Sequence, residues 1–465
     1  MDLDIEYRLC DKSGREMESA SGRIRAGQED LSIYPADGNP LILPWREISG
    51  IKAEDYKVVL ETISGDLVRV SSLGYKFEDF LRVSTHFRNE MMLKDMLMSE
   101  PLKKSQIEAE YALDSTSGKT MAQGKCELRL YETALIVMPD TAAVRRFPFR
   151  EISNVKNENH AVTVSLDSGE KITFSKLGNK FDFFTENLGA GISGMLAFGQ
   201  RILRDLTPAA DALTIRKASS VVKEGKILPI RLLRDLCPGF REGFEKKIKG
   251  IPESAKEYEF LRSLGNEDKI CAGFKKGLMG ALSGDYFMYL VPFCRPGDGP
   301  QGNAVAMETV PVVPRRDADK KTSARATYFF RMCPNDMFSA LKTVPALDAK
   351  MDEFIALFNR CMSAVNFRRA PIFATEAMLQ QPKYAAYRQA AATIAELKTL
   401  RSLFIGRVMH SDHAGWTAGI KNILKFNAAS RGGAEKWPQD AGLGEENDEP
   451  DHELSPPAAE NPKEK

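Results

Sequence analysis

The sequence lacks the features that define several large classes of protein. Its 465 residues carry 65 Lys and Arg against 64 Asp and Glu, a net charge of +1. This balance excludes a uniformly basic nucleic-acid coat and a wholly acidic disordered chain, and no specific nucleic-acid partner is predicted. The seven cysteines are scattered without a C-x-x-C pair, so neither a disulfide framework nor a zinc ribbon is expected.

Signals for secretion and for crossing a membrane are missing as well. The N-terminal segment is acidic and has no apolar core, so no secretory leader is expected. The longest uncharged glycine-rich stretch, residues 188–199, is much shorter than the roughly 20 residues that span a bilayer. We therefore expect a cytoplasmic protein without a transmembrane helix.

The common catalytic motifs are also absent: there is no G-x-S-x-G, no H-E-x-x-H and no glycine-rich dinucleotide fingerprint. Residues 117–120 read SGKT, but Leu113 stands where a phosphate loop needs its first glycine, so a hairpin turn is predicted. His410 and His413 have a metal-ligand spacing on a helix, yet no further Cys or His lies near them, which favours a polar helix terminus. His86 and His160 are expected at the surface. We predict no enzymatic activity, no metal and no cofactor.

What the chain does contain is a copy of part of itself. When the sequence is shifted by 104 residues, residues 5–80 align with residues 109–184 without a gap, and 25 of the 76 positions are identical. Unrelated chains of average composition match at roughly one position in twenty. The longest matches are R-E-I-S at residues 46–49 and 150–153 and the two L-G-x-K-F segments that begin at Leu73 and Leu177. The period is too long for a solenoid repeat and indicates a duplicated domain.

Each copy reads as short strands followed by one helix. In copy one, apolar positions 45, 48 and 51 are three apart, a spacing that a regular strand cannot place on one face, so a bend between two sheets is predicted there. The helix is expected to begin near Tyr75, with four large apolar residues on one side: Phe77, Phe80, Phe87 and Met91.

This order of seven strands, a bend after the fourth and a C-terminal helix resembles the pleckstrin-homology (PH) superfold. The motif P-W-R-E-I-x-x-I at residues 44–51, repeated as P-F-R-E-I-x-x-V at 148–155, is similar to the corner of PH-like and GRAM-like domains. The resemblance covers residues 1–190 and implies two PH-like β-barrels in tandem, each with a C-terminal helix. It supports the fold more than any function.

The resemblance also implies a candidate anion site. Lipid-binding PH domains gather basic side chains from the first strand–turn–strand, and the matching residues of copy one are Lys12, Arg15, Arg23 and Arg25. Arg23 and Arg25 are two apart on a strand and share a face, from which they can bind phosphate oxygens. Copy two has Glu127 in place of Arg23, which puts a lipid role for that copy in doubt. A solvated strand face is the alternative for copy one.

The remaining chain changes character. We predict an α+β protein divided into PH-like copy one (1–100), PH-like copy two (105–205), a basic helical linker (206–265), an α+β C-terminal domain (266–430) and a disordered acidic tail (431–465). Residues 266–345 have a strand order that suits a third, diverged PH-like unit as one hypothesis. Between Arg216 and Lys249 lie ten Lys or Arg and four acids. This segment either lies on an anionic membrane or packs its apolar residues inside the protein.

The predicted function is a non-catalytic protein-interaction or scaffold protein. Its partner would be a protein or peptide, and peripheral attachment to anionic membrane lipid is a further hypothesis. One alternative is an enzyme or small-molecule carrier with an anion-accepting pocket in the C-terminal α+β domain, lined by Arg325, Arg331, Arg368 and Arg369. Another is a chaperone-like binder of basic proteins that acts through the acidic tail.

Overall fold

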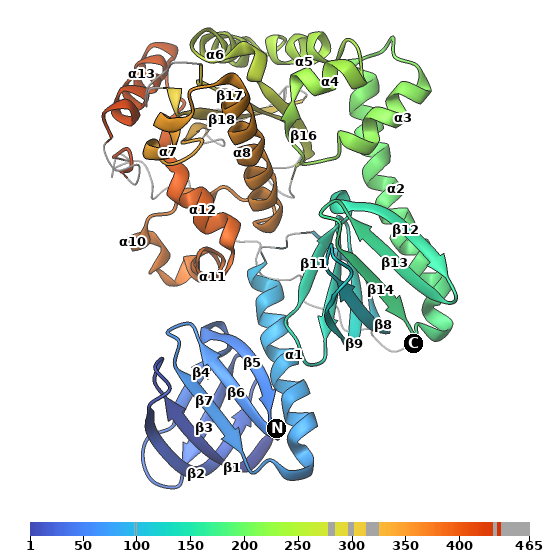
Figure 1. The fold of residues 1–465 in the computed structure, drawn as a ribbon, viewed down its shortest axis with the longest axis vertical. Helices are drawn as coiled ribbons and strands as arrows, with labels where there is room; N and C mark the ends of the chain where they lie inside the picture. The colour runs from blue at the N-terminus through green and yellow to red at the C-terminus, as the bar shows by residue number, and fades with distance from the viewer. Residues whose placement is uncertain are drawn as a thin grey trace, which may run out of the picture. The chain divides into compact units, whose positions relative to one another are not determined.

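The computed structural model describes residues 1–96, 98, 100–277, 284–295, 302–312, 325–430 and 435–438. The predicted acidic tail lies outside the described residues except for 435–438. The chain divides into two compact units, unit 1 (Met1–Ile192) and unit 2 (Ser193–Lys465). Both belong to the α+β class (Figure 1).

Copy one forms a seven-stranded antiparallel sheet with the order β4-β3-β2-β1-β7-β6-β5, followed by helix α1. Its elements are β1 (Asp2–Cys10), β2 (Glu16–Ala26), β3 (Asp30–Pro35), β4 (Leu41–Pro44), β5 (Ile48–Glu54), β6 (Lys57–Thr62), β7 (Leu67–Ser71) and α1 (Phe77–Asp95). The predicted bend is the 3₁₀ turn Trp45–Glu47, where the indole of Trp45 is 1% exposed. Its Nε1 donates to the carbonyl of Gly27 at 2.9 Å.

Copy two repeats this arrangement with the order β11-β10-β9-β8-β14-β13-β12. Its elements are β8 (Leu102–Asp114), β9 (Thr120–Tyr131), β10 (Ala134–Pro139), β11 (Arg145–Pro148), β12 (Ile152–Glu158), β13 (Ala161–Leu166), β14 (Lys171–Ser175) and α2 (Phe181–Leu206). Gly14 and Gly118 both have a positive φ, +83° and +78°, in the turn after the first strand. The SGKT segment is therefore the hairpin turn that the sequence predicted.

Unit 2 contains a six-stranded antiparallel sheet in which neighbouring strands are consecutive, β15-β16-β17-β18-β19-β20. The strands are β15 (Leu228–Pro229), β16 (Cys271–Lys276), β17 (Asp285–Pro292), β18 (Val305–Pro311), β19 (Ala326–Phe330) and β20 (Phe404–Met409). Its edge strands come from outside residues 266–345, and the described order is not that of copies one and two. The hypothesis of a third PH-like unit is therefore wrong for the described residues.

Helices surround the strands of unit 2. They are α3 (Ala212–Val221), α4 (Ile230–Leu236), α5 (Phe240–Lys249), α6 (Pro252–Leu264), α7 (Asn335–Ala340), α8 (Val344–Ala364), α9 (Ala370–Phe373), α10 (Glu376–Leu379), α11 (Ala385–Thr393), α12 (Ala395–Leu403) and α13 (His413–Ala429). None of the helices in the described ranges is both long and apolar enough to cross a membrane.

The basic segment of residues 216–249 packs its apolar side chains into the core of unit 2. Four large apolar residues of this segment, Ile227, Leu233, Phe240 and Phe244, are fully buried, while Leu232 is 49% exposed. Several of its cations have acidic neighbours, for example Lys247 with Asp205 at 2.7 Å. The packing alternative is confirmed, because an amphipathic membrane segment would need those apolar side chains at the surface.

Candidate functional site

Copy two binds part of copy one on the outer face of its sheet. We define the docking face as Glu127, Arg129, Ile136, Met138 and Arg146, which are cross-strand neighbours on β9, β10 and β11. All six residues of β10 are buried. Its Leu135 and Val137 face the core of copy two, while Ile136 and Met138 face helix α1. A strand that is buried on both faces needs a second layer, and the chain provides it from copy one.

Apolar contacts make up the centre of this interface. Ile136, Met138 and Val144 of copy two form one cluster with Leu93 of α1. Met92 and Met96 pack against the cluster from the same end of α1. Methionine is flexible and fills irregular gaps, so it suits a helix that packs on the face of a sheet.

A charged contact fixes the helix beside the apolar cluster. The guanidinium of Arg129 donates to Glu90 of α1 at 2.6 Å and to Glu127 of its own copy at 2.9 Å. Burial lowers the pKa of Arg129, but the hydrogen bonds to Glu127 and Glu90 outweigh it and raise this pKa overall. Arg129 is therefore charged at every ordinary pH, and its pair with Glu90 is partly shielded from solvent, where ion pairs are stronger than at an open surface.

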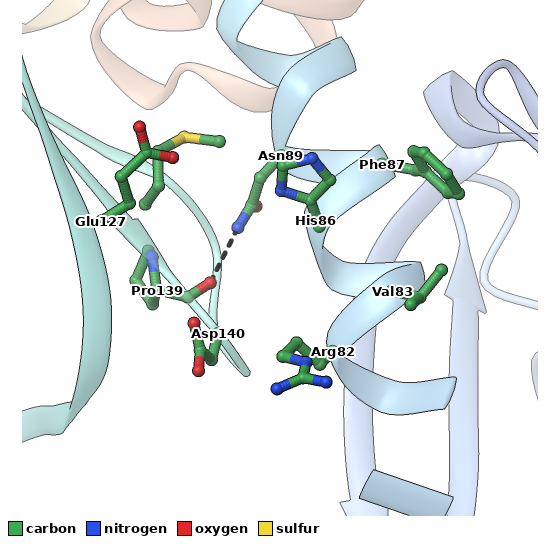
Figure 2. A pocket seen from close by; sticks show the side chains of 9 residues that line it. Arg82, Val83, His86, Phe87, Asn89, Glu127, Pro139 and Asp140 are labelled. Atoms are coloured by element: carbon green, nitrogen blue, oxygen red, sulfur yellow. Dashed lines mark hydrogen bonds between the residues drawn. The ribbon is translucent and has the colours of Figure 1, made fainter. Parts of the chain in front are cut away.

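Asn89 of α1 adds specificity to the docking. Its Nδ2 donates to the carbonyl of Ala142 at 2.9 Å and its Oδ1 accepts from the amide of Val144 at 2.9 Å. Beside it is a cavity of about 300 Å³, lined by residues that include His86, Asn89, Glu127 and Pro139. In Figure 2, Asn89 points from α1 toward Pro139 of copy two, while Phe87 points back into copy one.

Most of the same face of copy one is exposed. The residues of copy one that correspond to the docking face stand 104 positions earlier in the sequence. They are Arg23, Arg25, Ser32, Tyr34 and Ile42, and we call them the open face. The strand register is the same, with Arg23 opposite Tyr34 and Ser32 opposite Ile42. Tyr34 is 42% and Ile42 56% exposed, while Met138 at the position of Tyr34 is 4% exposed.

The four basic residues that the sequence singled out fall into two separate pairs. Lys12 and Arg15 lie in or beside the turn that joins β1 to β2, whereas Arg23 and Arg25 lie opposite Asp4 and Asp2 at the other end of that hairpin. At about 3.3 Å per residue, the seven steps from Glu16 to Arg23 span roughly 23 Å. The structure does not bring the two pairs together around one anion, and lipid binding by these residues stays a prediction.

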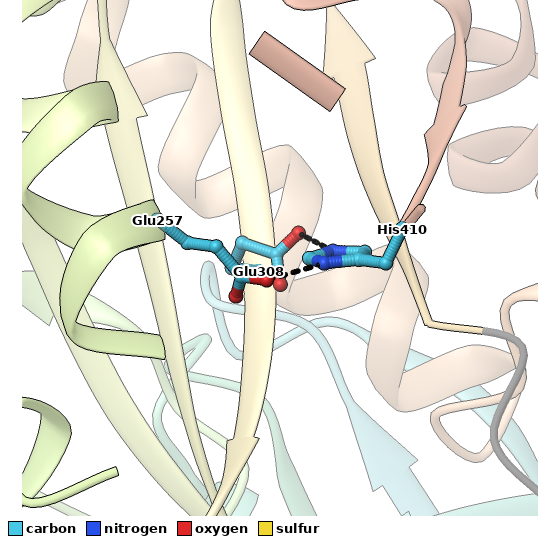
Figure 3. Close-up of side chains that lie close together, drawn as sticks. All are labelled: Glu257, Glu308 and His410. Atoms are coloured by element: carbon cyan, nitrogen blue, oxygen red, sulfur yellow. Dashed lines mark hydrogen bonds and ion pairs between the residues drawn. The ribbon is translucent and has the colours of Figure 1, made fainter. Parts of the chain in front are cut away.

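Unit 2 holds a buried charge cluster, which we define as Glu257, Glu308, Arg325 and His410. The ring of His410 has Glu257 Oε1 at 2.7 Å from Nδ1 and Glu308 Oε1 at 3.0 Å from Nε2. Figure 3 shows both carboxylates facing the imidazole, one from α6 and one from β18. Arg325 Nη2 donates to the second oxygen of Glu257 at 2.5 Å. The cluster thus alternates cation and anion and has no net charge.

The two carboxylates keep His410 protonated. Burial lowers the pKa of His410, but the hydrogen bonds to Glu257 and Glu308 outweigh it and raise this pKa from 6.5 to about 9. Trp416 stacks on the ring with centroids 5.6 Å apart, which also favours the cation. Glu257, Glu308 and His410 are a ligand set that a divalent metal can use, with ligand atoms within 4.8 Å of one another. Because both ring nitrogens already donate to carboxylates, we interpret the cluster as a structural ion-pair network.

The raised pKa predicts how the stability of unit 2 changes with pH. The folded protein binds the His410 proton more tightly than the unfolded chain, so the stabilisation is complete below pH 6.5 and is lost as the pH rises through about 9. The full loss is about 3 kcal/mol. Urea unfolding of the wild type and of His410→Gln at several pH values between 6 and 10 measures this loss. The loss appears as a difference in the free energy of unfolding between the two proteins that shrinks as the pH rises. A difference that does not change with pH would contradict the assignment.

The predicted anion pocket of unit 2 is not assembled as expected. Arg325 binds Glu257, while Arg369 contacts the Thr309 hydroxyl at 3.3 Å. Since Glu308 and Thr309 are consecutive on β18, their side chains point to opposite faces of the sheet. The fully buried Arg331 donates instead to Ser430 and to the carbonyl of Glu435. These three arginines therefore have separate surroundings and do not line one pocket.

Three further histidines of the described residues lie where the sequence placed them. His413 is the first residue of α13, whose N-cap is Asp412, so the predicted polar helix terminus is confirmed. His86 is half exposed on α1, and His160 lies in the turn between β12 and β13. The sequence missed the role of His410, because its two carboxylate partners are 153 and 102 residues away along the chain.

Comparison with known proteins gives little further information. No family model matches the chain, and no curated protein matches it. Among solved structures, it is similar to a chain of the Spt16D–Pob3N heterodimer, with 14% identity over 36% of this chain and 82% of that chain. The TM-score of 0.16 is too low to support a conclusion about function.

Proposed function

We propose that this chain is a non-catalytic protein-interaction scaffold that binds a partner protein through the tandem PH-like copies of unit 1. The observation that supports the proposal is the docking of α1 on copy two. There a sheet face of this fold holds a helix through an apolar cluster, an Arg–Glu pair and an asparagine that binds backbone groups. These are the elements of protein–protein recognition.

The buried charge cluster of unit 2 fits this proposal. Its cations and anions are paired with one another, and the ring of His410 is bonded through both nitrogens. A general acid or base needs a proton that it can exchange with a substrate, which a fully engaged imidazolium does not offer. We assign the cluster to the stability of unit 2.

Cross-linking of the full-length chain tests the scaffold function. The tagged chain is expressed at its native level in the organism that produces it. It is then cross-linked through lysines and purified, and the cross-linked peptides are identified by mass spectrometry. We expect a stoichiometric partner protein whose cross-links lie in residues 1–192. Recovery of the chain without a partner, or with a partner attached only to residues 193–438, would overturn the proposal.

A further inference from the structure

We infer that the open face of copy one is a second docking face, which binds a helix of a partner protein carrying two acidic residues one turn apart. This inference rests on the proposed function and adds the place and the chemistry of the partner. Its basis is the duplication. The outer sheet face that binds α1 in copy two recurs in copy one, with the same strands and the same register.

The open face has the composition of an interface, and four of its five residues are exposed, while Ser32 at its centre is buried. Tyr34 and Ile42 are large apolar side chains at 42% and 56% exposure. Within the described ranges, Arg25 forms no ion pair, although Asp2 lies opposite it on β1, whereas Arg129 at the same position of copy two binds Glu90. Arg23 has only a loose contact with Asp4, 3.7 Å between side chains that are 68% and 93% exposed. Aromatic and arginine side chains are enriched where protein surfaces meet.

The charges of the two faces define the partner. In copy two, Arg129 binds Glu90 of α1, and Glu127 and His86 line the same cavity. Burial raises the pKa of Glu127, but its hydrogen bonds and neighbouring positive charges outweigh burial and lower this pKa overall, Arg129 contributing most and His86 least. Copy one keeps the arginine, as Arg25, but has Arg23 in place of Glu127. A helix that fits copy one therefore needs an acid at the position of Glu90 and a second acid at the position of His86. These positions are four apart and lie on one side of a helix.

The backbone of copy one adds a further condition. Asn89 of α1 accepts a hydrogen bond from the amide of Val144, and the matching residue of copy one is Pro40, which has no amide hydrogen. The carbonyls that accept from Asn89 have counterparts at Pro35 and Gly38. The partner thus needs only a donor at this position.

A peptide probe with reciprocal charge reversal tests the inference on the full-length chain. The probe is a fluorescently labelled peptide of residues 77–96 with His86→Glu, titrated by anisotropy. We expect saturable one-to-one binding that is weaker for the unaltered peptide. Arg23→Glu with Arg25→Glu should weaken binding about tenfold or more. A peptide with lysine at both positions 86 and 90 should bind this reversed protein about tenfold better than the wild type.

The matched control reverses the other two basic residues. Lys12→Glu with Arg15→Glu makes the same change of charge at the opposite end of the hairpin and should leave peptide binding unchanged. If both double variants lost the same affinity for the peptide, the binding would be general charge attraction, and the inference would be overturned. So would the absence of peptide binding at millimolar concentration.

Two other occupants of the open face are outcomes of the same experiment. If vesicles of anionic phospholipid are retained by the wild type and not by the Arg23→Glu, Arg25→Glu variant, while the peptide is not bound, the face binds lipid and the inference is wrong. If sedimentation shows a dimer that this variant abolishes, the occupant is a second copy of the chain. A partner that cross-links to unit 1 at other residues would leave the scaffold function standing and remove only the docking face of copy one.

Discussion

Replacing Glu308 by Gln is expected to lower the free energy of unfolding of unit 2 by about 3 kcal/mol, since breaking a buried ion pair leaves its partner uncompensated. Glu308 is 1% exposed and accepts from the imidazolium of His410. Glutamine has the same shape but no charge, so the His410 ring loses one of the two anions that raise its pKa. Urea unfolding at pH 7 measures the loss.

The control for this substitution is Glu253→Gln at the exposed start of α6, which should change the free energy of unfolding by less than about 0.5 kcal/mol. The pair His410→Gln and Glu308→Gln provides a further check. The double variant should lose less free energy of unfolding than the sum of the two single losses, because both substitutions remove the same interaction. Additive losses would show that His410 and Glu308 act independently, contrary to our interpretation.

The second large effect is expected for Met138→Asp in the docking face of copy two. Met138 is 4% exposed and packs with Leu93 of α1. An unpaired carboxylate there costs several kcal/mol if it stays buried, so the helix end should separate from copy two. Hydrogen exchange of the amides of residues 88–95 measures this, and we expect it to become at least tenfold faster while the core of copy two stays protected.

The duplication provides a matched control at the same position of copy one. Tyr34→Asp makes the corresponding change on the open face, where the side chain is already 42% exposed. It should leave the exchange of residues 88–95 and the stability of the free chain unchanged, and should weaken binding of the peptide probe. Unaltered exchange in Met138→Asp would mean that α1 does not depend on the docking face.

Much of unit 1 was predictable from the sequence because the two copies constrain each other. The order of seven strands and a helix, the bend at Trp45 and the hairpin turn at Gly118 agree with the structure. The docking face also left a signal that the sequence interpretation did not use. Strand β10 reads ALIVMP, apolar at every position, whereas the matching strand β3 reads DLSIYP and alternates. A continuous apolar strand is buried on both faces, which indicates that another layer covers copy two.

The charge cluster of unit 2 could not be predicted in the same way. Glu257, Glu308 and His410 come from three elements that are far apart in sequence, and none stands in a recognisable motif. Only the fold of the sheet and α6 brings them together. The separation of the four basic residues was not predictable for a related reason. The spacing of Lys12, Arg15, Arg23 and Arg25 suits one short hairpin, but β2 is 11 residues long and separates the two pairs.

The central claim is that the outer face of β2, β3 and β4 in copy one binds a helix. Hydrogen exchange of the full-length chain, measured with and without the peptide probe, tests this claim most directly. Bound peptide should slow the exchange of amides in residues 23–43, and this protection should disappear in the Arg23→Glu, Arg25→Glu variant. Protection confined to unit 2, or protection of residues 23–43 that persists in this variant, would contradict the claim.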